Sequence, residues 1–176
     1  MEQFLNQYSK EKYLAADFVA EVLKLDQSSL KVITNILKEL NPSGNSFQVM
    51  FDLANQIAMK RKISIADVLN EIEVEQILNK DKISKKEKTS LIRKSLESLR
   101  YPEKQKILSD VSALVESIRR NHSVKVKLPQ DLEGDTIELS FSIKSPENLE
   151  SKTEDLLRLS KSPDIKRLFD HLLGRI

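Results

Sequence analysis

The feature that most constrains the fold is a change in the spacing of apolar residues between positions 119 and 156. On both sides of this region apolar residues recur every three or four positions, as they do along one face of a helix. Within it, every second residue is apolar in two short segments, Val124 to Leu128 and Ile137 to Ile143. Such alternation is typical of strands that bury one face and expose the other. The sequence therefore predicts a helix, a β-hairpin and a second helix here, and helices elsewhere.

Composition indicates a mainly helical chain with an aliphatic core. Apolar residues make up 39% of the 176 residues but aromatic residues only 5%, so Leu, Ile and Val must form most of the core. Three Gly and five Pro favour long uninterrupted elements over a turn-rich sandwich. We expect a mainly α (α+β) fold, with an all-helical domain over residues 1–101. A small α-β-β-α unit with a further C-terminal helix follows over residues 102–176.

Periodicity and capping residues predict the individual elements. In the first domain, helices are expected over residues 9–25, 26–40, 46–60, 64–72 and 84–99, with a further turn or two up to residue 78. Asp26 is expected to cap the second of these, and Ser64 and Ser84 each begin a capping box with an acidic residue three positions later. The second domain is predicted as a helix over 104–120, strands over 123–128 and 136–143, and Ser-Pro-initiated helices over 146–159 and 163–173.

Several classes of function lack sequence support. The chain has no Cys, so thiolate metal sites and a cysteine nucleophile are excluded. Its two histidines, His122 and His171, do not occur in the spacing of a metal ligand pair or a general base, and no Gly-rich phosphate loop is present. We expect no enzyme activity, no cofactor and no metal site. No apolar run approaches the roughly 18–20 residues that cross a bilayer, and the N-terminus is polar, so we expect a cytoplasmic protein without a membrane partner.

Charge is unevenly distributed along the chain. Residues 57–127 contain 17 basic and 10 acidic residues, a net charge of +7, whereas residues 128–160 carry a net charge of −5. Such asymmetry can mark a nucleic-acid-binding face, although a solvated Lys-rich helix surface gives the same imbalance. Lys86, Arg93 and Arg100 share one stripe of a predicted helix at seven-residue spacing. The candidate DNA contacts are Lys60, Arg61, Lys62, Lys85, Lys86, Arg93, Lys94, Arg100, Lys125 and Lys127.

Residues 53–72 also match part of a helix-turn-helix pattern, with two helices joined by a tight turn. The second helix offers Asp67, Asn70 and Glu71 as polar side chains, and phosphate would repel two of them. An ordinary αα-hairpin explains the same spacing.

Part of the second domain resembles a known family. Val124 to Leu128, Gly134 to Phe141 and Ser145 to Glu150, in the order helix, strand, strand, helix, are similar to the C-terminal dimerisation region of ParB-type chromosome and plasmid partition proteins. The resemblance covers about residues 102–160. It implies that the two-stranded sheets of two chains join, with Ile137, Leu139 and Phe141 at the dimer interface or in the core. It also implies that Lys125, Lys127 and Lys144 face DNA without sequence preference. The Gly-Glu-Arg-Arg phosphate motif of that family is absent, so nucleotide-dependent clamping is not expected.

These observations lead us to expect a non-enzymatic, homodimeric, DNA-associated protein. The alternative is an adaptor that binds a protein partner, with the apolar residues between Ile165 and Leu173 as the candidate surface and a basic face that is only solvated.

Overall fold

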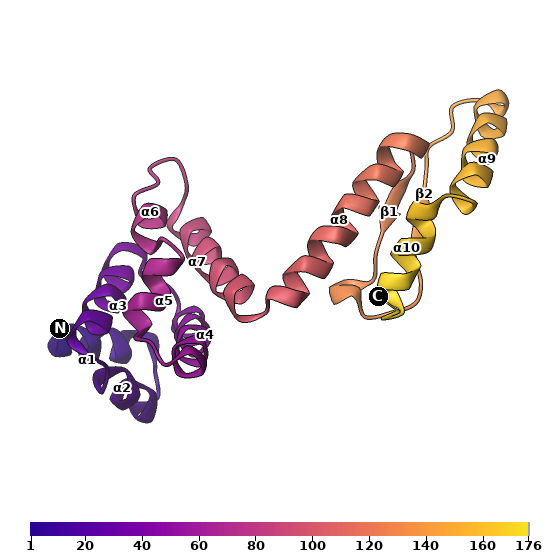
Figure 1. Cartoon of the computed structure of the whole chain (residues 1–176). Helices are drawn as coiled ribbons and strands as arrows, with labels where there is room; N and C mark the ends of the chain where they lie inside the picture. The colour runs from indigo at the N-terminus through magenta and orange to yellow at the C-terminus, as the bar shows by residue number, and fades with distance from the viewer. Residues whose placement is uncertain (176) are drawn as a thin grey trace. The chain divides into compact units, whose positions relative to one another are not determined.

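The computed structural model describes residues 1–175, apart from the side chain of Asp131. Within this range the chain forms ten α-helices, one 3-10 helix and a two-stranded antiparallel sheet (Figure 1). The predicted mainly α class with a small β-hairpin is thus confirmed. The chain divides into two compact units, which we call unit 1 (Met1–Pro102) and unit 2 (from Glu103 onward).

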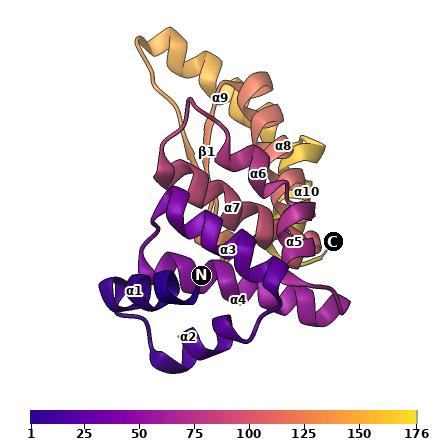
Figure 2. The same ribbon diagram turned by 90° about the vertical axis from the view of Figure 1, so that its left-hand side faces the viewer.

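Unit 1 is built entirely from helices, seen from the side of α1 and α2 in Figure 2. The helix α4 packs against α5 and α7, and α3 packs against the same two helices, so these four elements surround the core. The helices of unit 1 are α1 (Glu2–Lys12), α2 (Ala16–Leu23), α3 (Gln27–Leu40), α4 (Gly44–Arg61), α5 (Ile65–Glu71), α6 (Val74–Leu78) and α7 (Lys85–Arg100).

Side-chain caps fix the start of three of these helices, as the sequence predicts. The Asp26 carboxylate accepts the Ser29 N–H at 3.0 Å, which satisfies an orphan amide of α3. Ser64 and Ser84 both form capping boxes, at the N-termini of α5 and α7. These local hydrogen bonds explain why the predicted helix starts are confirmed at α3, α5 and α7.

The predicted single helix over residues 9–25 is wrong, because the chain forms α1 and α2 with a break between them. Tyr13 ends α1 in the left-handed conformation at φ 54°, and the Leu14 N–H donates to the Ser9 carbonyl at 3.0 Å. The buried Tyr8 hydroxyl on α1 donates to the Pro42 carbonyl at 2.6 Å. This contact with the α3–α4 turn holds α1 as a separate element, so tertiary packing outweighs the helical periodicity that runs through Tyr13.

The helix α4 begins at Gly44, two residues before its predicted start, because Ser43 caps it by accepting the Ser46 N–H. A Cβ on Gly44 would lie 2.7 Å from the Lys12 carbonyl oxygen. The end of α1 and the start of α4 therefore approach each other as closely as backbone allows.

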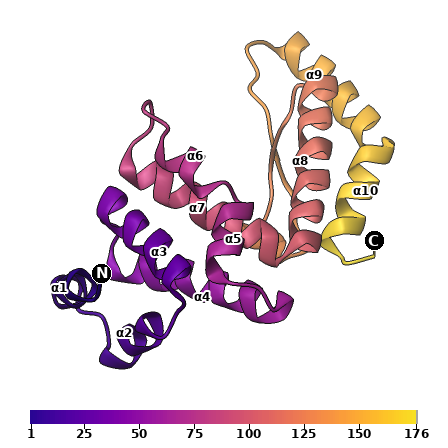
Figure 3. The same cartoon turned by 60° about the vertical axis from the view of Figure 1, so that its left-hand side comes forward.

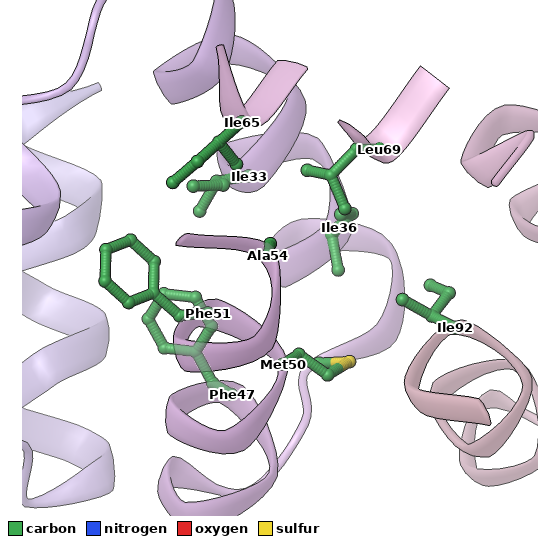
Figure 4. A pocket seen from close by; sticks show the side chains of 9 residues that line it. All are labelled: Ile33, Ile36, Phe47, Met50, Phe51, Ala54, Ile65, Leu69 and Ile92. Atoms are coloured by element: carbon green, nitrogen blue, oxygen red, sulfur yellow. The ribbon is translucent and has the colours of Figure 1, made fainter. Parts of the chain in front are cut away.

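The core of unit 1 contains one small gap between α3, α4, α5 and α7 (Figure 4). Its volume of about 20 Å³ is enough for about one water molecule. The lining is apolar, so it offers a ligand no hydrogen-bond partner. Nine side chains surround the gap: Ile33, Ile36, Phe47, Met50, Phe51, Ala54, Ile65, Leu69 and Ile92.

Unit 2 combines three helices with the hairpin, and Figure 3 shows α8 running alongside it. Its core joins Val111, Leu114 and Ile118 of α8 to Leu159 of α9 and Leu168 of α10. The elements are α8 (Pro102–His122), β1 (Lys125–Lys127), a 3-10 helix (Gln130–Leu132), β2 (Glu138–Ser140), α9 (Pro146–Ser160) and α10 (Pro163–Leu172).

The two strands are shorter than the predicted segments 123–128 and 136–143. Pairing is limited to three positions, with Val126 opposite Leu139 at the centre. Ser123 before β1 has a left-handed φ of 49°, and Pro129 after it has no N–H to donate to a ladder. Local backbone therefore ends β1 on both sides, although the apolar alternation continues in sequence.

Candidate nucleic-acid interface

A groove on unit 1 brings together three of the predicted DNA-contacting residues. It has a volume of about 580 Å³ and lies between α7 and the turn that joins α3 to α4. One wall carries Lys85, Lys86 and Arg93 of α7, and no Asp or Glu of the described chain is among its lining residues. We call this site the basic groove; its other lining residues are Leu40, Asn41, Pro42, Ser43, Ser46, Met50, Thr89 and Ser90.

The positions of the cations in the basic groove follow from how α7 begins. Ser84 caps the helix, and Glu87 accepts the Ser84 backbone N–H at 2.8 Å and its hydroxyl at 2.8 Å. These hydrogen bonds hold the pKa of Glu87 below its usual range, so this carboxylate is charged and occupied by the cap. Lys85 and Lys86 occupy the first turn, where a positive charge opposes the helix dipole. An anion bound in the groove would offset that repulsion.

The lysine at position 88 has a structural role instead. Its ammonium group donates to the Leu78 carbonyl at 2.5 Å, and so ties the first turns of α7 to the end of α6. Lys88 is therefore engaged within unit 1, whereas Lys85 and Lys86 are exposed and form no ion pair among the described residues.

Arg93 continues the cationic surface along α7. Its Nε lies 2.9 Å from Glu97 Oε1, and both side chains remain partly exposed, at 55% and 33%. An exposed pair of this kind contributes little to stability, about 0–1 kcal/mol, so a phosphate can compete for the guanidinium. Lys94, the next residue, is exposed but does not line the basic groove.

Arg100 lies at the far end of the same helix face. Lys86, Arg93 and Arg100 are seven residues apart and define what we call the basic stripe, which spans about 21 Å at 1.5 Å per residue. Arg100 Nε donates to Gln56 Oε1 of α4 at 3.1 Å. The start of α7 faces the start of α4 across the groove, and its end meets Gln56, so the stripe follows the boundary between the two helices.

The three cations at the end of α4 lie outside the basic groove and differ in their partners. Arg61 donates to both carboxylate oxygens of Glu71, at 2.9 and 2.7 Å, which fixes the α4–α5 pair. Lys62 occupies the left-handed position that ends α4, at φ 56°. Lys60 is exposed and lies one helical turn beyond Gln56, toward the Arg100 end of the basic stripe.

In the helix-turn-helix alternative, two of the three polar side chains offered by the second helix already have partners. On α5, Asp67 completes the capping box with Ser64, and Glu71 pairs with Arg61. Both carboxylates thus have partners within unit 1, as in an ordinary αα-hairpin.

The predicted contacts in unit 2 are spread over the hairpin. Lys127 Nζ lies 2.8 Å from Glu138 Oε2 across the strand pair, and this hydrogen bond raises the pKa of Lys127. Lys125 is exposed opposite Ser140. Of the two cations, Lys127 is therefore engaged with a neighbouring strand.

The three predicted interface residues occupy different environments. Ile137 packs against the core of unit 2 and Phe141 is half-buried, whereas Leu139 is 37% exposed. Ile137 and Leu139 line a mostly apolar groove of about 510 Å³ that also includes Leu156 and Phe169.

Sequence reasoning identified the cations but missed the opposite wall of the basic groove. Asn41, Ser43 and Ser46 face α7 although they lie about 40 or more residues away in the chain, and no local pattern indicates that contact. The predicted loop around Pro42 was the available signal, because a turn that leads into a helix presents polar side chains at the helix start.

Among the residues that the structure describes, no group of three or more His, Asp and Glu side chains could hold a metal ion. None of the described helices combines the length and the apolar character needed to cross a membrane.

Comparisons of the chain with models of known protein families, with curated proteins and with solved structures found no match.

Proposed function

We propose that this protein is a non-enzymatic DNA-associated protein that contacts phosphates through the basic groove and the basic stripe. The observation that carries the proposal is the convergence of Lys85, Lys86 and Arg93 in one groove without an acidic lining residue among those described. Phosphate contacts of this kind supply sequence-independent affinity, because each neutralised phosphate releases condensed counterions. The Ser90 hydroxyl, and whichever hydroxyl of the Ser43–Ser46 pair does not donate to the other, can donate to phosphate oxygens, whereas the Thr89 hydroxyl donates to the Lys85 carbonyl.

The proposal includes a homodimer formed through unit 2, in keeping with the resemblance of residues 102–160 to the dimerisation region of ParB-type partition proteins. Two observations support it. A two-stranded sheet leaves both outer edges without a strand partner within the described chain. Apolar side chains also remain exposed around it, with Leu139 at 37%, Ile143 at 51% and Phe169 at 37%.

The test reverses the charge of three residues of the basic groove and, in a control variant, of three lysines elsewhere on unit 1. We expect K85E/K86E/R93E to lose most of the affinity for random-sequence DNA at low salt. A matched control, K10E/K24E/K31E, changes the net charge by the same amount at exposed lysines away from the groove. Fluorescence anisotropy at several salt concentrations measures both the affinity and the number of phosphate contacts, since each contributes a slope of about −0.9 on duplex DNA. Equal losses in the two variants would contradict a localised site.

A second function is favoured by the exposed apolar side chains of α10, one of which also supports the homodimer. Phe169 and Leu173 are 37% and 42% exposed, and Phe169 lines the apolar groove with Leu139. A protein partner could cover this surface in place of a second copy, which would make the chain an adaptor. The two functions are distinguished by purifying F169E and the unchanged chain in parallel and comparing their bound proteins and their masses in solution. An adaptor should lose a bound protein in F169E, whereas a homodimer should dissociate to a monomer of half the mass.

A further inference from the structure

The basic stripe ends at an exposed aromatic ring. The guanidinium carbon of Arg100 lies 4.8 Å from the centroid of the Tyr101 ring, a cation–π distance. Tyr101 is 43% exposed and directly follows α7. The Arg100 guanidinium, held by Gln56, thus lies over one face of the Tyr101 ring, and the rest of this partly exposed ring is accessible where α4 and α7 meet.

The exposure of Tyr101 is not explained by the core of unit 1. The buried aromatic residues pack edge to face around Phe47, with ring centroids 5.4 Å from Phe18 and 6.0 Å from Tyr8. Tyr13 is also exposed, at 94%, but it lies at the α1–α2 break, and neither the basic groove nor the basic stripe includes it. Tyr101 is therefore the exposed ring that adjoins the cations of the stripe.

Cations and an aromatic ring recognise different parts of a nucleic acid. Lysine and arginine contact phosphates in both single and double strands, whereas an aromatic side chain stacks on the face of a base. In a duplex these faces are covered by neighbouring base pairs. In a single strand they are accessible, and a positively charged groove combined with a stacking ring is the arrangement that holds such strands.

Building on the proposed nucleic-acid function, we propose that unit 1 prefers single-stranded nucleic acid, with phosphates along the basic groove and stripe and one base stacked on Tyr101. The basic stripe sets the path of the strand along α7, between the start of the helix and Arg100. Lys60, one turn beyond Gln56, is placed to contact a phosphate next to the stacked base.

The experiment compares the full-length protein on an oligothymidine strand of about 12 nucleotides, within the usual range of such sites, and on a duplex of the same length. The single strand is expected to bind more tightly. Y101A should weaken single-strand binding by about 5- to 150-fold, the range for loss of one stacked base, and leave duplex binding nearly unchanged. Y101F keeps the ring and should retain the affinity, which separates stacking from a hydroxyl contact.

Tyrosine emission gives a second readout, because the chain has three Tyr and no Trp. Stacking on Tyr101 should quench this emission in the unchanged protein and in Y13F, but not in Y101F.

The experiment distinguishes failure of the proposed DNA-binding function from failure of the single-strand preference alone. If neither nucleic acid binds at low salt, the proposed function falls and this inference falls with it. If the duplex binds as tightly as the strand and Y101A has no effect on either, the inference alone is overturned and phosphate binding stands. Circular dichroism of Y101A checks that the helices are intact.

Discussion

The buried hydroxyl of Ser29 joins the starts of two helices, and its removal should destabilise unit 1. Ser29 is fully buried, at 0% exposure. Its Oγ donates to Asp26 Oδ2 at 2.6 Å and accepts the Ala66 N–H at 3.0 Å. The Ala66 amide is one of the free donors in the first turn of α5, so Ser29 of α3 satisfies it across 37 residues of chain.

In S29A the Ala66 N–H loses this acceptor in a position where water has little access, since Ala66 is 5% exposed. A buried donor without a partner costs about 1–3 kcal/mol in the free energy of unfolding. For a unit of about 100 residues this corresponds to a fall of roughly 4–24 °C in Tm. The cap of α3 persists in the variant, because Asp26 Oδ1 still accepts the Ser29 backbone N–H.

Urea unfolding followed by tyrosine emission measures this loss selectively, because Tyr8, Tyr13 and Tyr101 all lie in unit 1. S28A is the matched control: the neighbouring hydroxyl is exposed and donates to the same Asp26 carboxylate. We expect S28A to change stability by less than about 0.5 kcal/mol. A loss in S29A no larger than that in S28A would refute the argument from the buried amide.

Three further predictions follow from contacts in unit 1. E97Q should raise DNA affinity up to about fivefold in anisotropy titrations, because it frees Arg93 from an ion pair worth about 0–1 kcal/mol. A lower affinity of E97Q would count against Arg93 as a phosphate ligand. G44A should lower the free energy of unfolding, measured in urea, by about 1–3 kcal/mol, because the new Cβ would lie 2.7 Å from the Lys12 carbonyl oxygen. This cost is expected despite the better helix propensity of Ala. Unchanged stability would show that the ends of α1 and α4 move apart at little cost. Hydrogen bonds from the Ser28 and Ser29 side chains lower the pKa of Asp26 from 3.8 to about 2, so its contribution to stability is present above about pH 4 and is lost as the pH falls toward 2; urea midpoints across this range should fall less steeply in D26A.

The elements that the sequence predicted correctly are those fixed by local chemistry. Asp26, Ser64 and Ser84 each accept the amide three residues further on, so their caps are visible in a short window of sequence. The Ser-Pro starts of α9 and α10 were confirmed for the same reason, at Ser145 and Ser162.

The elements that it did not predict depend on contacts between distant residues. The break at Tyr13 is stabilised by the packing of Tyr8 against Pro42, 34 residues away. Burial raises the pKa of the Tyr8 hydroxyl to about 12, in keeping with its role as a hydrogen-bond donor inside unit 1. Nothing in the sequence near Tyr13 indicates this partner, since the apolar spacing continues through it.

In the candidate site, too, the features that follow from local spacing could be predicted, whereas those that depend on distant contacts could not. Helical spacing placed Lys86, Arg93 and Arg100 on one stripe, because that follows from 3.6 residues per turn. It did not separate Lys85 from Lys88, which are both in the first turn of α7. Only the position of α6 shows that Lys88 donates to Leu78 while Lys85 lines the basic groove.

The most direct test of the central claim is the salt dependence of DNA binding by the unchanged protein. Anisotropy titrations with a random-sequence duplex over a range of salt concentrations give log K against log salt. Light scattering on the same sample gives the molar mass of the protein and so its oligomeric state. If Lys85, Lys86 and Arg93 each neutralise one phosphate, the slope of log K against log salt is about −2.7 or steeper for each unit 1 that is bound. The variant K85E/K86E/R93E should lose this salt dependence. Absence of binding at low salt, or binding that salt does not weaken, would contradict phosphate recognition by the basic groove.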